Sequence, residues 1–265
     1  PNFSTLMVLG YALLMTMDHT NNGHPPTGHQ LVATEDGSFT LYSERFDENC
    51  HSTAGAKLET LTHYLRGCQV EHLLKTKTNV RILEVGFATG LGWRMTQDLA
   101  LHFPDCKLEF VSLEIDEALI QWAEPHLMRQ SQAELNWFEK TEGNAELKVL
   151  AGDARLTLPR FAENFPQHFD AIYQDAFSPK KNPTLWTTEW FTLLGQLSHP
   201  GTLMSTYSAS ISIRKAMAAA GWGVMSGEKF GPKRTSTRAR WQHASDPAIL
   251  ELLARSPTLA LKDEA

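Results

Sequence analysis

Short apolar runs alternate with helix-like segments from Val80 to Ser226, and no other feature of the sequence restricts the possible folds as strongly. The apolar runs predict strands at Arg81–Val85, Lys107–Glu114, Glu146–Leu150, Phe169–Gln174, Thr202–Tyr207 and Trp222–Ser226. The segments between them predict helices at Gly90–Phe103, Glu117–Met128, Arg155–Phe165, Thr187–Leu197 and Ser210–Ala220. Strands that alternate with helices form a parallel sheet with helices on both faces. We therefore expect an α/β, Rossmann-like fold with a mostly parallel sheet.

The region before Val80 predicts a small N-terminal β-hairpin and helix extension. Two β-prone runs surround Asp36-Gly37 within His29–Ser43, which is a strong hairpin signal, and Ser52–Lys75 has the apolar spacing of a helix. With 265 residues, the chain suits one large domain with small extensions. We place an N-terminal extension at residues 1–28, the hairpin and helix at 29–78, the core at 79–242 and a C-terminal tail at 243–265.

The apolar run Leu6–Met17 raises the question of a secretion signal. No lysine or arginine precedes Arg45, so the positively charged start of a signal peptide is missing. The run is also shorter than the roughly 20 residues that cross a bilayer. The 3 cysteines are widely spaced and form neither a disulfide framework nor a C-x-x-C pair. We therefore expect a packed N-terminal element, a reducing cytoplasmic setting and no membrane contact.

Four consecutive predicted strands end in, or lead directly into, a carboxylate: Glu84, Glu114, Asp153 and Asp175. Ligands of such folds bind beyond the carboxyl ends of the strands, so these groups are expected around one ligand. A single acidic residue there is more often a helix cap, but the recurrence favours a binding role. A ligand with an ammonium, a sulfonium, a ribose diol and an adenine amine would give each carboxylate a partner. S-adenosylmethionine has all four groups.

The first predicted strand leads into the glycine-containing loop "LEVGFATGLG" (Leu83–Gly92). Gly86 and Gly90 permit a tight turn and a close approach of the backbone to a ligand. The loop lacks the Walker lysine, and Ala88 breaks the G-x-G-x-x-G pattern. Glu84 would repel a phosphate, which favours a cationic or zwitterionic ligand. We assign cofactor binding to Glu84, Gly86, Gly90, Glu114, Asp153 and Ala154.

Several segments of the chain resemble a known family. The Leu83–Gly92 loop resembles the first motif of class I methyltransferases, with Ala88 where glycine is usual. The segment "DAFSPKKNPTLW" (Asp175–Trp186) is similar to a signature of MnmC-type tRNA methyltransferases. Further segments resemble that family in the same order, namely "DGSFTLYS" (36–43), "CHSTAGAKLET" (50–60) and "GPKRTSTRAR" (231–240). The resemblance runs from about His29 to Trp241 and implies a class I methyltransferase fold.

The resemblance also implies an activity. Members of this family use S-adenosylmethionine to methylate the primary amine of 5-aminomethyl-2-thiouridine at the wobble position of tRNA. Some are fused to a flavin-dependent oxidase, but this sequence has no second glycine fingerprint, so we expect the stand-alone methyltransferase form. The resemblance marks Asp175 as the critical acid. A carboxylate there can bind the cationic amine, orient its nitrogen and accept its proton.

Two basic clusters point to tRNA as the partner. Lys180 and Lys181 lie beside Asn182 on a connection stiffened by Pro179 and Pro183, where they can meet phosphate. The second cluster lies in a segment that contains no acidic residue, and it consists of Lys229, Lys233, Arg234, Arg238 and Arg240. The formal net charge is −6, so these clusters predict one directed face on an acidic protein. Lys180, Lys181, Asn182, Lys233 and Arg234 are the predicted tRNA-binding residues.

Two other function classes remain open from the residues alone. A polyamine aminopropyltransferase shares the fold, but its glycine- and aspartate-rich first loop is absent and its pocket needs no basic face. A non-catalytic RNA-binding or nucleotide-binding module could also keep the fold, and loss of Glu84 or Asp175 would have favoured it. The sequence shows no G-x-S-x-G, no H-E-x-x-H and no paired zinc ligands, so neither hydrolase chemistry nor a metal is expected.

Overall fold

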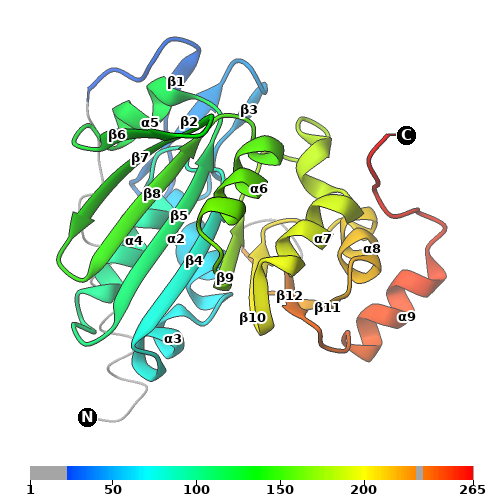
Figure 1. Cartoon of the computed structure of the whole chain (residues 1–265). Coiled ribbons are helices and arrows are strands. Elements are labelled where there is room, and N and C mark those ends of the chain that lie inside the picture. The colour runs from blue at the N-terminus through cyan, green and yellow to red at the C-terminus, as the bar shows by residue number, and fades with distance from the viewer. Residues whose placement is uncertain (1–22, 231–234, 265) are drawn as a thin grey trace.

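The computed structural model describes residues 23–230 and 235–264, and in them a nine-stranded mixed sheet forms the centre of the molecule (Figure 1). In spatial order its strands are β11 (Trp222–Ser226), β12 (Thr237–Trp241), β10 (Ser198–Thr206), β9 (Phe169–Gln174), β4 (Asn79–Val85), β5 (Lys107–Glu114), β8 (Ala145–Ala151), β7 (Leu135–Glu142) and β6 (Met128–Gln132). The inner strands from β10 to β8 are parallel, as predicted. The strands toward both edges pair antiparallel.

Helices cover both faces of the sheet. Neighbouring residues of the inner strands point to opposite sides, so each face presents apolar side chains that the helices bury. In β4, Ile82 belongs to one hydrophobic core and Leu83 to the other. The first core holds residues of α3 (Val70–Thr76), α4 (Leu91–Ala100) and α5 (Glu117–Ala123). The second holds residues of α6 (Ala154–Asn164), α7 (Thr188–Gln196), α8 (Ile211–Ala219) and α9 (Pro247–Arg255). Each fully buried large apolar side chain in these cores contributes about 1.5–3 kcal/mol.

The edge hairpin β6–β7 differs from the predicted helix Glu117–Met128. The helix α5 ends at Ala123, because the following Glu124 precedes Pro125 and takes a non-helical conformation. The turn between β6 and β7 has two left-handed residues, Ala133 with φ 46° and Glu134 with φ 64°. Such a turn matches the twist of a hairpin, but it normally carries Asn-Gly or Asp-Gly. Its sequence therefore gave no hairpin signal.

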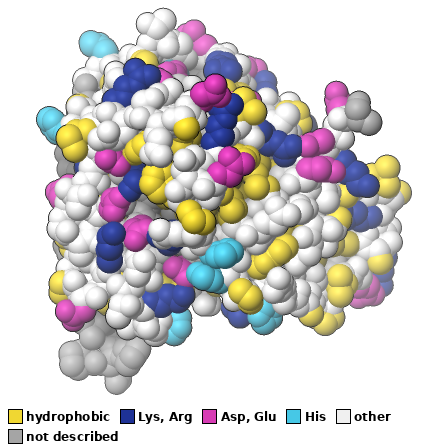
Figure 2. Space-filling model, viewed as in Figure 1, with side chains coloured by type: hydrophobic (Ala, Val, Ile, Leu, Met, Phe, Trp, Pro, Cys, Tyr) yellow, Lys and Arg dark blue, Asp and Glu magenta, His cyan; other side chains and the backbone are white. Residues whose placement is uncertain are grey.

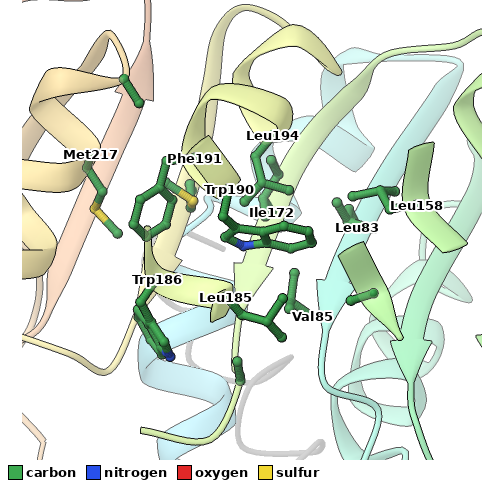
Figure 3. Close-up of a cluster of buried hydrophobic side chains, with 14 of the residues drawn as sticks. Leu83, Val85, Leu158, Ile172, Leu185, Trp186, Trp190, Phe191, Leu194 and Met217 are labelled. Carbon is green, nitrogen blue, oxygen red and sulfur yellow. The ribbon is translucent and has the colours of Figure 1, made fainter. Parts of the chain in front are cut away.

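The strand β12 contains two residues of the predicted basic cluster, Arg238 and Arg240. It inserts between β10 and β11 and runs antiparallel to both, so the strand order at this edge departs from the order along the chain. Residues 231–234, which include Lys233 and Arg234, lie outside the described part of the chain. The Trp241 ring packs on Gly195 and lies 5.1 Å from the Trp222 ring. Trp186 is fully buried in the second core (Figure 3). Trp186 and Trp241 are therefore both packed against neighbouring residues of the protein.

The predicted hairpin and helix region, residues 29–78, is called the N-terminal extension from here on, and it contains the hairpin and a broken helix. The strands β1 (His29–Ala33) and β2 (Phe39–Ser43) pair around Asp36-Gly37, and β3 (Glu48–Asn49) adds to β2. Instead of one helix over Ser52–Lys75, the chain forms α2 (Ala56–Thr60), the π-helix η1 (Leu61–Arg66) and α3. The break before α3 falls at Gln69, which has a left-handed φ of 55°.

The C-terminal residues are packed on the core. Asp246 caps α9 by accepting from the Ala248 amide at 2.8 Å, and Ile249 and Leu253 of α9 are buried in the second core. Further along, the Leu261 carbonyl accepts from the Thr188 amide at 2.9 Å. The apolar run Leu6–Met17 lies outside the described residues. No helix in the described part of the chain has the length and apolar character to cross a membrane.

Candidate functional site

A cavity of about 200 Å³ lies at the carboxyl ends of the inner strands. The loops after β4, β5, β8 and β9 all contribute to it, as expected for a parallel sheet of this type. Of the predicted site residues, the structure brings six together in its lining: Gly86, Glu114, Asp153, Ala154, Asp175 and Asn182. The sequence prediction that several strand ends meet at one ligand-sized space is therefore met by this geometry.

The loop after β4 lies against the loop after β9. Gly86 has a φ of 105°, and a Cβ there would lie 2.7 Å from the carbonyl oxygen of Asp175. Glycine is therefore required both by conformation and by space. Ala88 has a φ of 47°, which costs a residue with a side chain roughly 1–2 kcal/mol. The Ala88 amide donates to Glu114 Oε2 at 3.0 Å, which holds this strained turn in place.

Glu114 is bound to backbone amides at the end of β5. Its Oε1 accepts from Ile115 at 2.8 Å and from Asp116 at 3.1 Å, in addition to the Ala88 bond at Oε2. Burial raises the pKa of Glu114, and the three amides act in the opposite direction. The carboxyl group is thus oriented on the cavity wall, where it can accept hydroxyl groups.

Glu84 and Gly90 are predicted ligand contacts, but neither belongs to the cavity lining. Side chains alternate along β4, so Val85 faces the cavity region while Glu84 shares the opposite face with Ile82. Glu84 is 3% exposed, accepts from Ser112 Oγ at 2.7 Å and abuts Gly92 of α4. Gly90, with a φ of 72°, starts α4 close to the Phe87 ring. Both residues support the loop from behind.

The buried Glu84 predicts a pH effect on stability. Burial raises its pKa from 4.5 to about 8, so the fold favours the protonated carboxyl. The stability contributed by Glu84 is therefore fully present below its unfolded pKa and is lost as pH rises toward 8, by roughly 1.4 kcal/mol per pH unit. In Glu84→Gln, the melting temperature should fall less over this range than in the wild type. Thermal melts followed by circular dichroism measure it, with the exposed Glu163→Gln as control. Parallel curves for Glu84→Gln and the wild type would contradict the expectation.

Asp175 follows β9 and is held by groups from distant parts of the chain. Its amide donates to the Val85 carbonyl at 3.1 Å, which ties the loop to β4. The Tyr64 hydroxyl, from η1, donates to Asp175 Oδ1. Tyr64 is buried and stacks on Tyr173, with 5.3 Å between ring centroids. Burial, followed by the charge of Asp175, raises the pKa of Tyr64, so the phenol remains a neutral donor.

The loop after Asp175 is fixed at several points. The Tyr207 hydroxyl donates to the Ala176 carbonyl at 2.8 Å, and Trp186 Nε1 donates to the Phe177 carbonyl at 2.8 Å. The Ser178 carbonyl accepts from the amides of Lys181 and Asn182 at 2.8 and 2.9 Å, respectively. This connection is thus a rigid turn, as its prolines predict.

The turn between β2 and β3 lies over the same loop. The rings of Phe46 and Phe177 stack with 4.3 Å between centroids, and Glu48 Oε2 accepts from the Ser178 amide at 2.8 Å. Lys181 Nζ forms an ion pair with Asp47 at 2.8 Å. Lys181 therefore binds this turn in addition to its predicted role toward phosphate.

Acidic and basic side chains are interspersed on the face of the molecule that Figure 2 shows. Lys180 and Lys229 are exposed, and Arg238 and Arg240 of β12 are half-buried.

Sequence reasoning assigned no role to several residues at the site: Phe46, Glu48, Glu59, Tyr64 and Tyr207. The signal for three of them was indirect. Glu59 lies in the quoted segment 50–60, and Phe46 and Glu48 lie between that segment and the hairpin. Nothing local in the sequence marks Tyr64 or Tyr207, because their partners are contributed by the loop after β9.

Comparisons with known proteins agree with this geometry. A family model described as S-adenosyl-L-methionine-dependent methyltransferase matches residues 98–242. The bifunctional protein MnmC of tRNA 5-methylaminomethyl-2-thiouridine biosynthesis from Ectopseudomonas mendocina is 33% identical over 195 residues, which are 67% of this chain and 29% of that protein. The protein of the same name from Ralstonia nicotianae is 30% identical over 231 residues, covering 79% of this chain and 35% of its own length. The chain thus spans about a third of these relatives.

A solved structure extends the similarity over nearly the whole chain. The crystal structure of MNMC2 from Aquifex aeolicus superimposes with a TM-score of 0.73 at 27% sequence identity. The match covers 99% of this chain and 92% of that one. It includes the N-terminal extension, which lies outside the residues matched by the family model.

Proposed function

The chain belongs to the S-adenosyl-L-methionine-dependent methyltransferase family, and from this premise we propose that it methylates the 5-aminomethyl group of the wobble (2-thio)uridine in tRNA. The product is 5-methylaminomethyl-(2-thio)uridine. We call the cavity of about 200 Å³ the cofactor cavity. The observation that carries the proposal is the position of Asp175, whose carboxylate lies on the wall of this cavity and is oriented by Tyr64. The similarity to MnmC proteins supports the tRNA substrate. We place the reaction in the cytoplasm, as expected for tRNA modification.

The residues of the cavity fit S-adenosylmethionine. Glu114 can accept both hydroxyls of a ribose, and Asp153, which also caps α6 through the Arg155 amide at 2.9 Å, can accept from the adenine amine. Gly86 and Ala154 let the backbone approach the ligand closely. When bound, this cofactor supplies an electrophilic methyl group on a sulfonium. Glu84 would act indirectly, by holding the loop that carries Gly86.

Asp175 addresses the main chemical obstacle of the reaction. An alkylamine has a pKa of about 10, so at neutral pH its nitrogen is protonated and has no free lone pair. In the proposed role, the Asp175 carboxylate first binds the ammonium and then accepts its proton, directly or through a water molecule. The bond from Tyr64 and the fixed loop backbone limit the positions of the carboxylate, which favours the in-line geometry needed for transfer.

The direct test is methyl transfer to defined RNA. Wild-type protein and S-adenosylmethionine are mixed with tRNA that carries 5-aminomethyluridine at the wobble position, and the nucleosides are analysed by mass spectrometry. The proposal expects a mass gain of one methyl group on that nucleoside alone. An unchanged RNA would contradict it. Transfer of an aminopropyl group from decarboxylated S-adenosylmethionine to a polyamine would instead favour the aminopropyltransferase-like class.

Removing the exposed lysines of the loop should weaken tRNA binding. In Lys180→Ala and Lys181→Ala, each lost phosphate contact should lower affinity and reduce the salt dependence of log K by about one unit of slope. Asp47→Ala is an informative counterpart, because it frees Lys181 from its ion pair and should not weaken binding. Lys262→Ala, an exposed lysine of the C-terminal segment, is the control. Fluorescence anisotropy at several salt concentrations measures the effect. Unchanged affinity and slope in both loop variants would mean that the RNA binds elsewhere.

A further inference from the structure

A second cavity, of about 260 Å³, adjoins the cofactor cavity at Asp175. We call it the polar cavity, and its lining consists of Glu48, Asn49, Cys50, His51, Ser52, Thr53, Glu59, Asp175, Ala176, Phe177 and Tyr207. Four of these residues, Cys50, Asp175, Ala176 and Phe177, also line the cofactor cavity. A group held in the polar cavity would therefore lie beside Asp175 and next to the bound methyl donor.

The lining of the polar cavity is acidic. It contains three carboxylates, those of Glu48, Glu59 and Asp175, and no lysine or arginine is among these described lining residues. Burial and then the charge of Arg94 lower the pKa of His51 to about 4, so this imidazole is neutral at pH 7. A pocket with this acidic lining favours a cation and disfavours an anion, because carboxylates attract positive charge and the protein wall screens that attraction less than water does.

The two glutamates are held in place by backbone amides. Glu59 is 5% exposed, and its Oε2 accepts from the Ser52 amide at 2.6 Å. Glu48 Oε2 accepts from the Ser178 amide at 2.8 Å, so this carboxylate is attached to the loop that carries Asp175. Such fixed carboxylates recognise charge without first having to be ordered.

Both glutamates come from outside the part of the chain that the methyltransferase family model matches. That match covers residues 98–242, whereas Glu48 lies in β3 and Glu59 in α2. The matched core thus supplies Asp175 and most of the cofactor cavity, and the N-terminal extension supplies the remaining wall of the polar cavity. This division is what would be expected if the extension determines which substrate is accepted.

We propose that the polar cavity is the subsite for the substrate's cationic amine, and that Glu59, together with Glu48, selects a positively charged substituent over a neutral or anionic one of similar size. The inference rests on the proposed function, since it names the substrate group recognised at the same site. Glu59 and Glu48 add their charge to that of Asp175 in binding the ammonium, and Asp175 alone takes the proton. Atoms and charges balance. The ammonium gives one proton to Asp175, the amine lone pair forms the new N–C bond, and the S–C electron pair stays on sulfur, which becomes a neutral thioether. The positive charge of the sulfonium passes to the methylated nitrogen, which is released as a secondary ammonium.

This division of roles predicts that substitutions of Glu59 and Asp175 affect different kinetic parameters. Glu59→Gln keeps an acceptor for the Ser52 amide but loses the charge, so the KM for RNA should rise about tenfold or more while kcat changes little. Asp175→Asn should instead lower kcat. A purely structural role of Glu59 would instead lower kcat, together with the melting temperature.

The test uses a charge series at one position. Anticodon stem-loop RNAs carry 5-aminomethyl-, 5-hydroxymethyl- or 5-carboxyuridine at the wobble position, giving a cation, a neutral isostere and an anion. Their affinities are measured with wild type, Glu59→Gln and Glu48→Gln in the presence of S-adenosylhomocysteine, which prevents turnover. The matched control is Glu44→Gln, an exposed glutamate of the turn that precedes β3.

We expect the wild type and Glu44→Gln to prefer the cation over the neutral RNA by at least about tenfold, and Glu59→Gln to lose most of that preference. Glu48→Gln provides a second variant in case the first folds poorly. If both variants keep the wild-type preference while the wild type methylates the aminomethyl RNA, the inference is overturned and the proposed function stands. If the wild type transfers no methyl group to that RNA, the proposed function and the inference both fail.

Discussion

Asp175→Ala should remove nearly all methyl transfer while leaving the fold and the affinity for S-adenosylmethionine close to those of the wild type. Loss of a general base costs about 10²–10⁴-fold in rate, and loss of substrate orientation adds to that. Cofactor affinity should persist because the groups expected to hold the ribose and adenine, Glu114 and Asp153, are unchanged. Single-turnover assays on tRNA with 5-aminomethyluridine give the rate, and calorimetry gives the cofactor affinity.

The variant Asp175→Asn separates the two roles of this side chain. It preserves size and the acceptor for Tyr64 but removes charge and basicity. If Asp175 is the base, the Asn variant should be slow at neutral pH and should recover rate only at higher pH, where the amine is already neutral. Asp105→Ala, at an exposed aspartate before β5, serves as the control. Near-wild-type turnover in Asp175→Ala would refute the mechanism and the assignment of this loop as the active site.

Glu114→Ala should weaken S-adenosylmethionine binding by about 10-fold to 150-fold. A charge-assisted hydrogen bond to the ribose is worth about 1.5–3 kcal/mol, and each 1.4 kcal/mol changes affinity tenfold. The substitution also removes the acceptor of the Ala88 amide, so the left-handed turn after β4 loses its fixed geometry. Both effects act on the same cavity and in the same direction.

Calorimetric titration with S-adenosylmethionine measures this effect, and S-adenosylhomocysteine should show a similar loss because it keeps the ribose. Glu117→Ala is the matched control, because Glu117 lies three residues further on and pairs with Arg129 at the surface. An unchanged affinity in Glu114→Ala would show that the cofactor's ribose lies elsewhere in the cavity.

Local pattern was enough to locate the inner strands. The inner strands β5 and β9 begin and end where the apolar runs predicted, because a strand buried on both faces needs a continuous run of apolar residues. The edge strand β11 also has its predicted bounds. The edge hairpin β6–β7 and the strand β12 were missed as strands. These segments form strands because they pair with neighbouring strands, and their own sequence does not reveal this pairing. The turn of the β6–β7 hairpin also lacks the usual glycine.

The sequence by itself determined the α/β class and the placement of carboxylates at successive strand ends, since both follow from short-range periodicity and chain order. Only the tertiary structure decided which of these groups face the cavity. It turned Glu84 away from the cavity while Glu114 and Asp175 line it. It also brought Tyr64 into a hydrogen bond with Asp175, 111 positions further along the chain, and placed Glu59 in the lining of the same polar cavity as Asp175. Such contacts depend on how the extension packs against the sheet, and local periodicity carries no information about that packing.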